Sequence, residues 1–247
     1  MALSQTEQAA RNNAIWCDTV CRAHGIPGEF HDALWINRHS VPRFYSNVVT
    51  LTDQRNATTQ LAQIQALLES SLPGNWSVKD SFCALDLTDF GFQVLFEATW
   101  LCRAPAPTAL DDIDSRIRWT LVHDESELAQ WETAWSDEPK NRSSIPQPRL
   151  FVPTLLGDHN VAFIAAYQDE AIVAGAIANR TGDVVGLSNV FTPAAGNDLF
   201  WEGCIDSAQE RFPGLPLVGY ERGPELAVAQ QVGFEKLQSL RVWIRQG

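Results

Sequence analysis

Histidine and cysteine, the side chains that most often bind transition metals or act as base or nucleophile near neutral pH, number only five each in this sequence and are scattered along it. Cys17 and Cys21 stand one helical turn apart and His24 follows them, a spacing that could supply part of a metal site. Zinc takes four ligands, and no second Cys or His pair stands at a suitable spacing. We therefore expect buried structural cysteines and no metal. The other histidines share no motif and are expected to be surface or hydrogen-bonded residues: His31, His39, His123 and His159.

The compact motifs of several large enzyme classes are missing. The sequence has no Gly-x-Ser-x-Gly elbow, no phosphate loop with Gly-Lys-Ser/Thr, and no Gly-x-Gly-x-x-Gly after a strand. Serine hydrolase, nucleoside triphosphatase and dinucleotide oxidoreductase functions therefore have no support.

An aromatic-rich segment, residues 34–45, carries Arg38, His39 and Arg43. It could line a cleft in which arginine meets an acidic ligand. It could also be an irregular arm that packs its rings onto the sheet of the other half of the chain. The large area that aromatic rings bury favours packing.

The charge balance limits the partners. Of 247 residues, 18 are Lys or Arg and 30 are Asp or Glu, which gives a net charge of −12. Because polyanions would repel such a chain, we exclude nucleic acid and anionic membrane surfaces. No apolar run reaches the length of a membrane span. Five scattered cysteines, an odd number, and a polar start without a signal peptide indicate a cytoplasmic protein.

The first half alternates helical and extended patterns. Apolar spacing predicts helices over 6–22 and 58–70 and strands over 47–52, 76–85 and 93–103. A Pro-rich and then acidic stretch interrupts this pattern. We therefore predict an N-terminal domain over residues 1–104, a linker over 105–116 and a C-terminal domain over 117–247.

The second half has the clearer pattern. Asp124 and Glu127 form a variant capping box that opens a helix whose residues Leu128, Trp131 and Trp135 share one face. This helix follows a strand over 118–122, and three strands over 161–167, 171–178 and 184–191 then predict an antiparallel meander. A helix over 197–212, a strand over 214–220, a helix from 223 to 233 and two strands over 234–237 and 240–245 complete a mixed α/β sheet.

A short echo links the two halves. Gly91-Phe92 precedes Trp100-Leu101-Cys102-Arg103, and Gly233-Phe234 precedes Trp243-Ile244-Arg245. Two matches of this length leave both duplication and coincidence open.

The element order of the second half, with Val218-Gly219-Tyr220-Glu221, the stretch from Ala229 to Phe234, and Trp243, resembles the GNAT superfamily of acyl-CoA-dependent N-acyltransferases. The short helix that ends in Gly-Phe before the last strands carries most of this resemblance, which covers about residues 116–246. The resemblance implies an α/β (α+β) mixed-sheet fold that is complete in the C-terminal half. It implies a reduced copy, without the central meander, in the N-terminal half.

The resemblance also implies acetyl-CoA as cosubstrate. In this superfamily the strand before the central helix splays and pairs its backbone with the pantetheine arm, and the following turn binds the pyrophosphate. The matching positions are Asn189, Val190 and Phe191 on the strand and Ala195, Gly196, Asn197 and Asp198 in the turn. The turn departs from the superfamily pattern because it keeps one glycine, has no basic residue, and places Asp198 where phosphates would arrive.

The catalytic positions depart as well. Many members carry a Tyr four residues before the Gly-Phe pair as general acid, and here that position is Ala229. The resemblance implies Glu221 as the base and Tyr220 as the hydroxyl nearest in sequence that could replace the acid. Alternation along 215–221 leaves a second interpretation open, with Tyr220 in the core and Glu221 on the surface.

We therefore predict an acetyl-CoA-dependent N-acetyltransferase for an amine of a small molecule or a peptide. A catalytically inactive ligand-binding or regulatory protein on the same fold is the alternative, because Ala229 and the phosphate turn depart from the pattern. A structural subunit with an aromatic contact surface is the third interpretation. CoA binding separates the first two, and a large apolar interface in a stable oligomer would mark the third. The sequence specifies neither the acceptor nor the oligomeric state.

Overall fold

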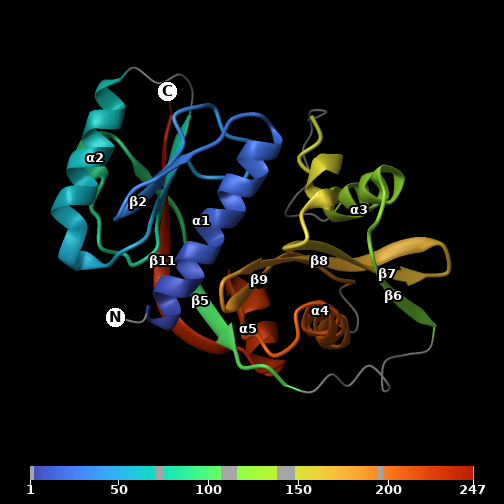
Figure 1. The fold of residues 1–247 in the computed structure, drawn as a ribbon. Coiled ribbons are helices and arrows are strands. Elements are labelled where there is room, and N and C mark those ends of the chain that lie inside the picture. Colours follow the sequence, from blue (N-terminus) through green and yellow to red (C-terminus); the bar gives the residue numbers. More distant parts are fainter. Residues whose placement is uncertain (1–2, 71–74, 107–115, 138–147, 194–196, 247) are drawn as a thin grey trace. The chain divides into compact units, whose positions relative to one another are not determined.

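The computed structural model describes residues 3–70, 75–106, 116–137, 148–193 and 197–246, and Figure 1 traces them. They group into two compact units, Met1–Trp100 with Lys236–Gly247, and Leu101–Glu235. Most of the predicted linker, residues 107–115, lies outside the described residues. Among the described helices, none is both long and apolar enough to cross a membrane.

Short strands form the sheet of the first unit, in the order β1–β2–β3–β4–β11. Their bounds are β1 (Glu29–Phe30), β2 (Leu34–Ile36), β3 (Val48–Thr50), β4 (Trp76–Asp80) and β11 (Glu235–Arg245). β1, β2 and β3 pair antiparallel, β4 runs parallel to β3, and β11 runs antiparallel to β4. The aromatic-rich segment therefore begins as a fully buried strand of this sheet.

Helices cover both faces of this sheet, as Figure 1 shows for α1 (Gln5–Ala23) and α2 (Ala57–Glu69). α2 packs Ile64 and Leu67 into a core cluster that includes Leu34 of β2. The next residue, Trp35, points to the opposite face because side chains alternate along a strand. There its indole Nε1 donates a hydrogen bond of 3.1 Å to Asp18 of α1.

The second unit contains the predicted antiparallel meander. Its strand order is β10–β9–β8–β7–β6. The bounds are β6 (Ile117–Leu121), β7 (Val161–Gln168), β8 (Ala171–Thr181), β9 (Val184–Phe191) and β10 (Leu217–Glu221). β6 to β9 pair antiparallel, and β10 runs parallel to β9. The mixed α/β class expected from the sequence is confirmed.

Helices α3 (Glu125–Asp137) and α4 (Asn197–Arg211) lie on opposite faces of this meander (Figure 1). On one face Trp131 of α3 packs edge-on against Phe163 and Phe191, with ring centroids 5.2 and 5.3 Å apart. On the other face α4 and α5 (Gly223–Gln231) share a core cluster with Ile164. At the predicted start of α3, the Asp124 carboxylate accepts the backbone N–H of Glu127 at 2.9 Å, and the Glu127 carboxylate accepts the backbone N–H of His123 at 2.8 Å in place of that of Asp124.

The two similar Gly-Phe segments of the sequence each lead into a long strand of the same length. β5 (Gln93–Arg103) and β11 are both 11 residues long, and each begins two residues after a glycine with positive φ, 80° at Gly91 and 91° at Gly233. Leu101, ten residues after Gly91, lies in the core of the second unit, and Trp243, ten residues after Gly233, lies in that of the first. Each half thus runs through three antiparallel strands, a helix, a parallel strand, a left-handed glycine and a long strand.

Three sequence expectations need correction. The first half does not lack the meander, because β1, β2 and β3 form a short one. The two predicted closing strands are the single strand β11, since the polar residues at 238 and 239 are exposed and do not interrupt it. The strand predicted over 76–85 ends at Asp80, whose carboxylate accepts the backbone N–H groups of Ala84 and Leu85 and holds the chain in a turn.

Candidate active site

Two neighbouring parallel strands of the second unit separate along their length. β9 and β10 are in register only at Leu217–Val185 and Val218–Gly186 within the described part of the chain. At the next step Gly219 is required, because a Cβ there would lie 2.7 Å from the carbonyl oxygen of Leu187. Beyond it β9 continues to Phe191 and β10 to Glu221 without further register pairs. This leaves a length of β9 backbone that can pair with an added extended group.

A β-bulge lies in the same length of β9. Gly175 of β8 faces Phe191 while Ile177 faces Ser188, so two residues of β9, Asn189 and Val190, oppose one residue of β8. Asn189 adopts a positive φ of 55°, which non-glycine residues rarely do and Asn tolerates best. Such bulges redirect backbone groups and occur often beside active sites.

The side chains around the bulge divide by role. Val190 and Phe191 are buried in the core, so only their backbone groups could face a ligand. Ser188 is half-buried, and its hydroxyl oxygen is buried with no hydrogen-bond partner among the described residues. A buried hydroxyl without a partner costs free energy, which a bound polar group at this position would recover.

The predicted phosphate turn is described only in part. Ala195 and Gly196 lie outside the described residues, whereas Asn197 and Asp198 form the first turn of α4. The Thr192 hydroxyl donates a hydrogen bond to the Asn197 side chain and ties the end of β9 to the start of α4. Asp198 is exposed in this turn, where its charge suits the helix dipole but competes with any anionic group.

The predicted catalytic pair lies at the same edge of the sheet. β9 and β10 are parallel, so Tyr220 and Glu221 at the carboxyl end of β10 share that edge with the bulge. Both are half-buried, a placement intermediate between the core and surface alternatives. Ala229 of α5 is fully buried, so this position supplies neither a proton donor nor a space for one.

The cysteines are suited to packing. All five thiols are free, and Cys17, Cys21, Cys102 and Cys204 are buried. Burial raises the pKa of each thiol, that of Cys21 to about 12 with smaller contributions from Cys17 and Asp18. A raised pKa keeps these groups protonated near neutrality, which opposes both metal binding and nucleophilic chemistry. Among the described residues no cluster of three metal-ligating side chains occurs.

Comparison with solved structures finds the same architecture over nearly the whole chain. A GCN5-related N-acetyltransferase from Kribbella flavida matches with a TM-score of 0.63 and 14% identity, over 97% of this chain and 96% of the other. This chain has a GNAT fold. A GCN5-related N-acetyltransferase from Sphaerobacter thermophilus matches with a TM-score of 0.57 and 9% identity, over 99% and 97% of the two chains. No protein-family model matches the sequence. No curated protein matches it either.

The GNAT fold extends over both halves of this chain, since the matches cover both chains almost completely. A GCN5-related N-acetyltransferase-like protein from Streptococcus suis matches with a TM-score of 0.53 and 13% identity, over 98% of each chain. At these identities the likeness concerns the fold, so the roles of the site residues rest on their own geometry.

Sequence reasoning missed two features of the site. The bulge could have been suspected from the polar pair Ser188-Asn189 inside an otherwise apolar strand, because Asn is the side chain that most readily accepts a positive φ. The unpartnered hydroxyl of Ser188 has no signal in the sequence, since it depends on how neighbouring strands pack.

Proposed function

We propose that this protein is an N-acetyltransferase that transfers an acetyl group from acetyl-CoA to an amine of a small molecule or a peptide. The observation that carries the proposal is the opening between β9 and β10, where register pairing stops after Val218–Gly186 while both strands continue. An open strand edge next to the start of a helix can bind an extended amide-bearing arm through its backbone and an anion at the helix end.

Different residues of the chain would bind the pantetheine arm and the phosphates of acetyl-CoA. Backbone groups of Ser188 to Phe191 would pair with the amides of the pantetheine arm. The Ser188 hydroxyl would gain the partner that it lacks. The first turn of α4 would take the phosphates, with Asp198 weakening that interaction through like charge.

Glu221 and Tyr220 are the proposed acid–base pair. When bound, acetyl-CoA supplies the activated acyl group as a thioester. Glu221 would accept a proton from the ammonium group of the acceptor, since an amine attacks only when neutral. As the C–N bond forms and the C–S bond breaks, Tyr220 would donate a proton to the departing thiolate and regain one from the attacking nitrogen, a role that buried Ala229 cannot take.

Binding is tested by titrating acetyl-CoA, CoA and a longer acyl-CoA while following thermal unfolding. A ligand that binds only the folded state stabilises it by about 2.7 kcal/mol at a hundredfold excess over Kd. Asn189→Gly keeps the positive φ and should bind like the wild type, whereas Asn189→Val cannot hold that conformation and should bind at least ~10-fold more weakly. Equal binding by the two variants would contradict a role for the bulged backbone.

Activity is tested on a panel of amines that includes polyamines, amino-acid amides and peptide amino termini, with thiol release as the readout. Glu221→Gln should lower kcat by about 100-fold at neutral pH and leave acetyl-CoA affinity unchanged. The loss should shrink as pH rises, because more acceptor is then already deprotonated. A variant with wild-type activity at every pH would remove Glu221 from the mechanism.

A catalytically inactive ligand-binding or regulatory protein is the second candidate, and the burial of Ala229 favours it. It predicts saturable CoA binding without thiol release for any amine in the panel. The two candidates differ only in turnover, so binding and activity must be measured separately. Five free cysteines fit the reducing cytoplasm in which we place the protein under either function.

A further inference from the structure

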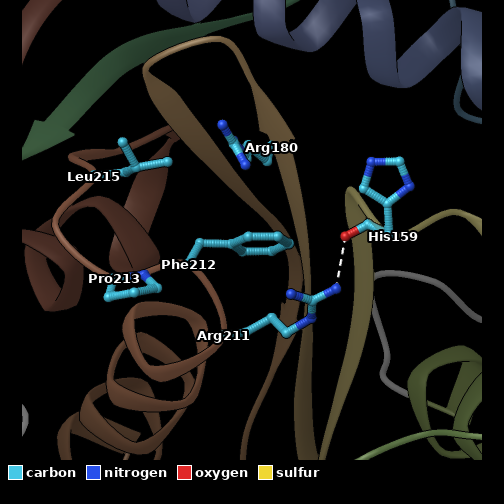
Figure 2. A pocket seen from close by; sticks show the side chains of 6 residues that line it. All are labelled: His159, Arg180, Arg211, Phe212, Pro213 and Leu215. Atoms are coloured by element: carbon cyan, nitrogen blue, oxygen red, sulfur yellow. Dashed lines mark hydrogen bonds between the residues drawn. The ribbon is translucent and has the colours of Figure 1, made fainter.

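A cationic pocket lies elsewhere in the second unit. Figure 2 shows its six lining residues: His159, Arg180, Arg211, Phe212, Pro213 and Leu215. Its volume is about 350 Å³, within the range of small-molecule sites. The Phe212 ring lies between the two arginines, and the Arg211 guanidinium sits 4.7 Å from the centre of that ring.

The two guanidinium groups carry charge that no described carboxylate neutralises. Arg211 donates to the carbonyl oxygen of His159 at 2.6 Å, and Arg180 donates to that of Gly182 at 3.4 Å. Neither forms an ion pair with any described residue, although the chain has 30 acidic residues and only 18 basic ones. Both arginines keep further N–H donors, because a guanidinium carries five.

The pocket is separate from the proposed acetyl-CoA site. It lies where β9 and β10 begin and α4 ends, whereas the opening lies where the strands end and α4 begins. α4 has 15 residues, so its two ends are roughly 22 Å apart at 1.5 Å per residue. One molecule of an added small anion therefore cannot occupy both places.

Charge and surface together define the ligand class. The carboxyl end of α4 contributes about half a negative charge to the pocket, which two full positive charges exceed. Phe212, Pro213 and Leu215 provide an apolar floor that an inorganic anion would leave unused. We propose that this pocket binds a small carboxylate with an apolar or aromatic body, its carboxylate on Arg180 and Arg211 and its body on Phe212 and Leu215.

The test is an NMR titration of the full chain with benzoate, followed through the methyl groups of Leu215. We expect saturable shifts with a Kd of about 1 mM, as suits so small a ligand. Arg180→Gln and Arg211→Gln should each weaken binding by about 10-fold or more through loss of a charge-assisted hydrogen bond. Arg118→Gln is the matched control, since Arg118 is an exposed arginine of the same unit that stacks on Tyr167 outside the pocket, and it should bind benzoate like the wild type.

Two further probes separate the contributions. Benzamide has the same ring without the charge, and phosphate has charge without the ring, so each should bind at least ~10-fold more weakly than benzoate. The proposal is overturned by no Leu215 response up to about 50 mM benzoate. It is overturned equally by wild-type affinity in either Arg180→Gln or Arg211→Gln, or by phosphate or benzamide matching the affinity of benzoate.

Discussion

At the scale of single residues, close packing around the bulge explains why Gly175 stands in the middle of β8. A Cβ at this position would lie 2.5 Å from the carbonyl oxygen of Ile164 and 2.8 Å from the ring of Phe191. The same carbonyl accepts the indole N–H of Trp131 at 2.7 Å. A side chain at Gly175 would therefore disturb a buried hydrogen bond and the strand residue that borders the bulge.

Gly175→Ala should lower the free energy of unfolding by about 1–3 kcal/mol, because the methyl group overpacks a rigid site. Gly157→Ala is the control, since nothing lies within 4 Å of a Cβ there, and its effect should stay within about 0.5 kcal/mol. Urea denaturation at 25 °C measures both. A loss below about 0.5 kcal/mol at Gly175 would mean that the strands are not packed as closely as described.

At the scale of elements, the carboxyl end of β5 is held to the helical side of the second unit by one arginine. Arg103 donates through Nε to the carbonyl oxygen of Val232 at 3.0 Å and through Nη1 to the Gln209 side chain at 3.2 Å. Val232 is the C-cap residue of α5, where carbonyl groups lack partners within the helix. Arg103 therefore caps α5 from a different element.

Arg103→Met should cost about 1–3 kcal/mol of stability, because it leaves the Val232 carbonyl without its side-chain donor. Arg245 is the matched position, 12 residues after Gly233 as Arg103 is after Gly91, but its side chain forms no hydrogen bond with any described residue. Arg245→Met should therefore change stability by no more than about 0.5 kcal/mol in the same denaturation assay. Similar losses for both would show that the arginines act through general charge and not through capping.

The bounds of the helices and strands also show which parts of the fold could be predicted from the sequence. Regular apolar spacing located α3 and the meander, because helices and sheets with one buried face repeat at 3.6 and 2.0 residues. Apolar spacing gave the wrong end for β4, because the turn that follows depends on the buried carboxylate of Asp80. It did not reveal β1 or β2, because strands of two or three residues are too short to show a period. For the candidate site, the sequence indicated the strand and the edge, but the bulge and the Ser188 hydroxyl arise from packing between strands.

At the scale of the whole molecule, the two units are built from interleaved parts of the sequence. Residues 236–247 belong to the first unit, although they follow the whole of the second unit in the sequence. Residues 101–103, the last three of β5, belong to the second unit, although β5 begins in the first. Neither core is complete without residues from the other half of the chain. We therefore expect that a cut in the predicted linker would not yield two independent domains.

Because of this interleaving, we expect substitutions at the matched strands β5 and β11 to destabilise different units. Trp243→Ala should cost about 3–5 kcal/mol and Leu101→Ala about 2–5 kcal/mol, since both side chains are buried. Trp243 packs in the core of the first unit, so its loss should speed amide hydrogen exchange most in β4, with which β11 pairs. Leu101 belongs to the core cluster of the second unit, which includes Leu187 of β9 and Leu217 of β10, so its loss should speed exchange most in β9 and β10. Each variant is the control for the other, and the reverse pattern would show that β5 and β11 stabilise the unit in which their own half of the sequence lies.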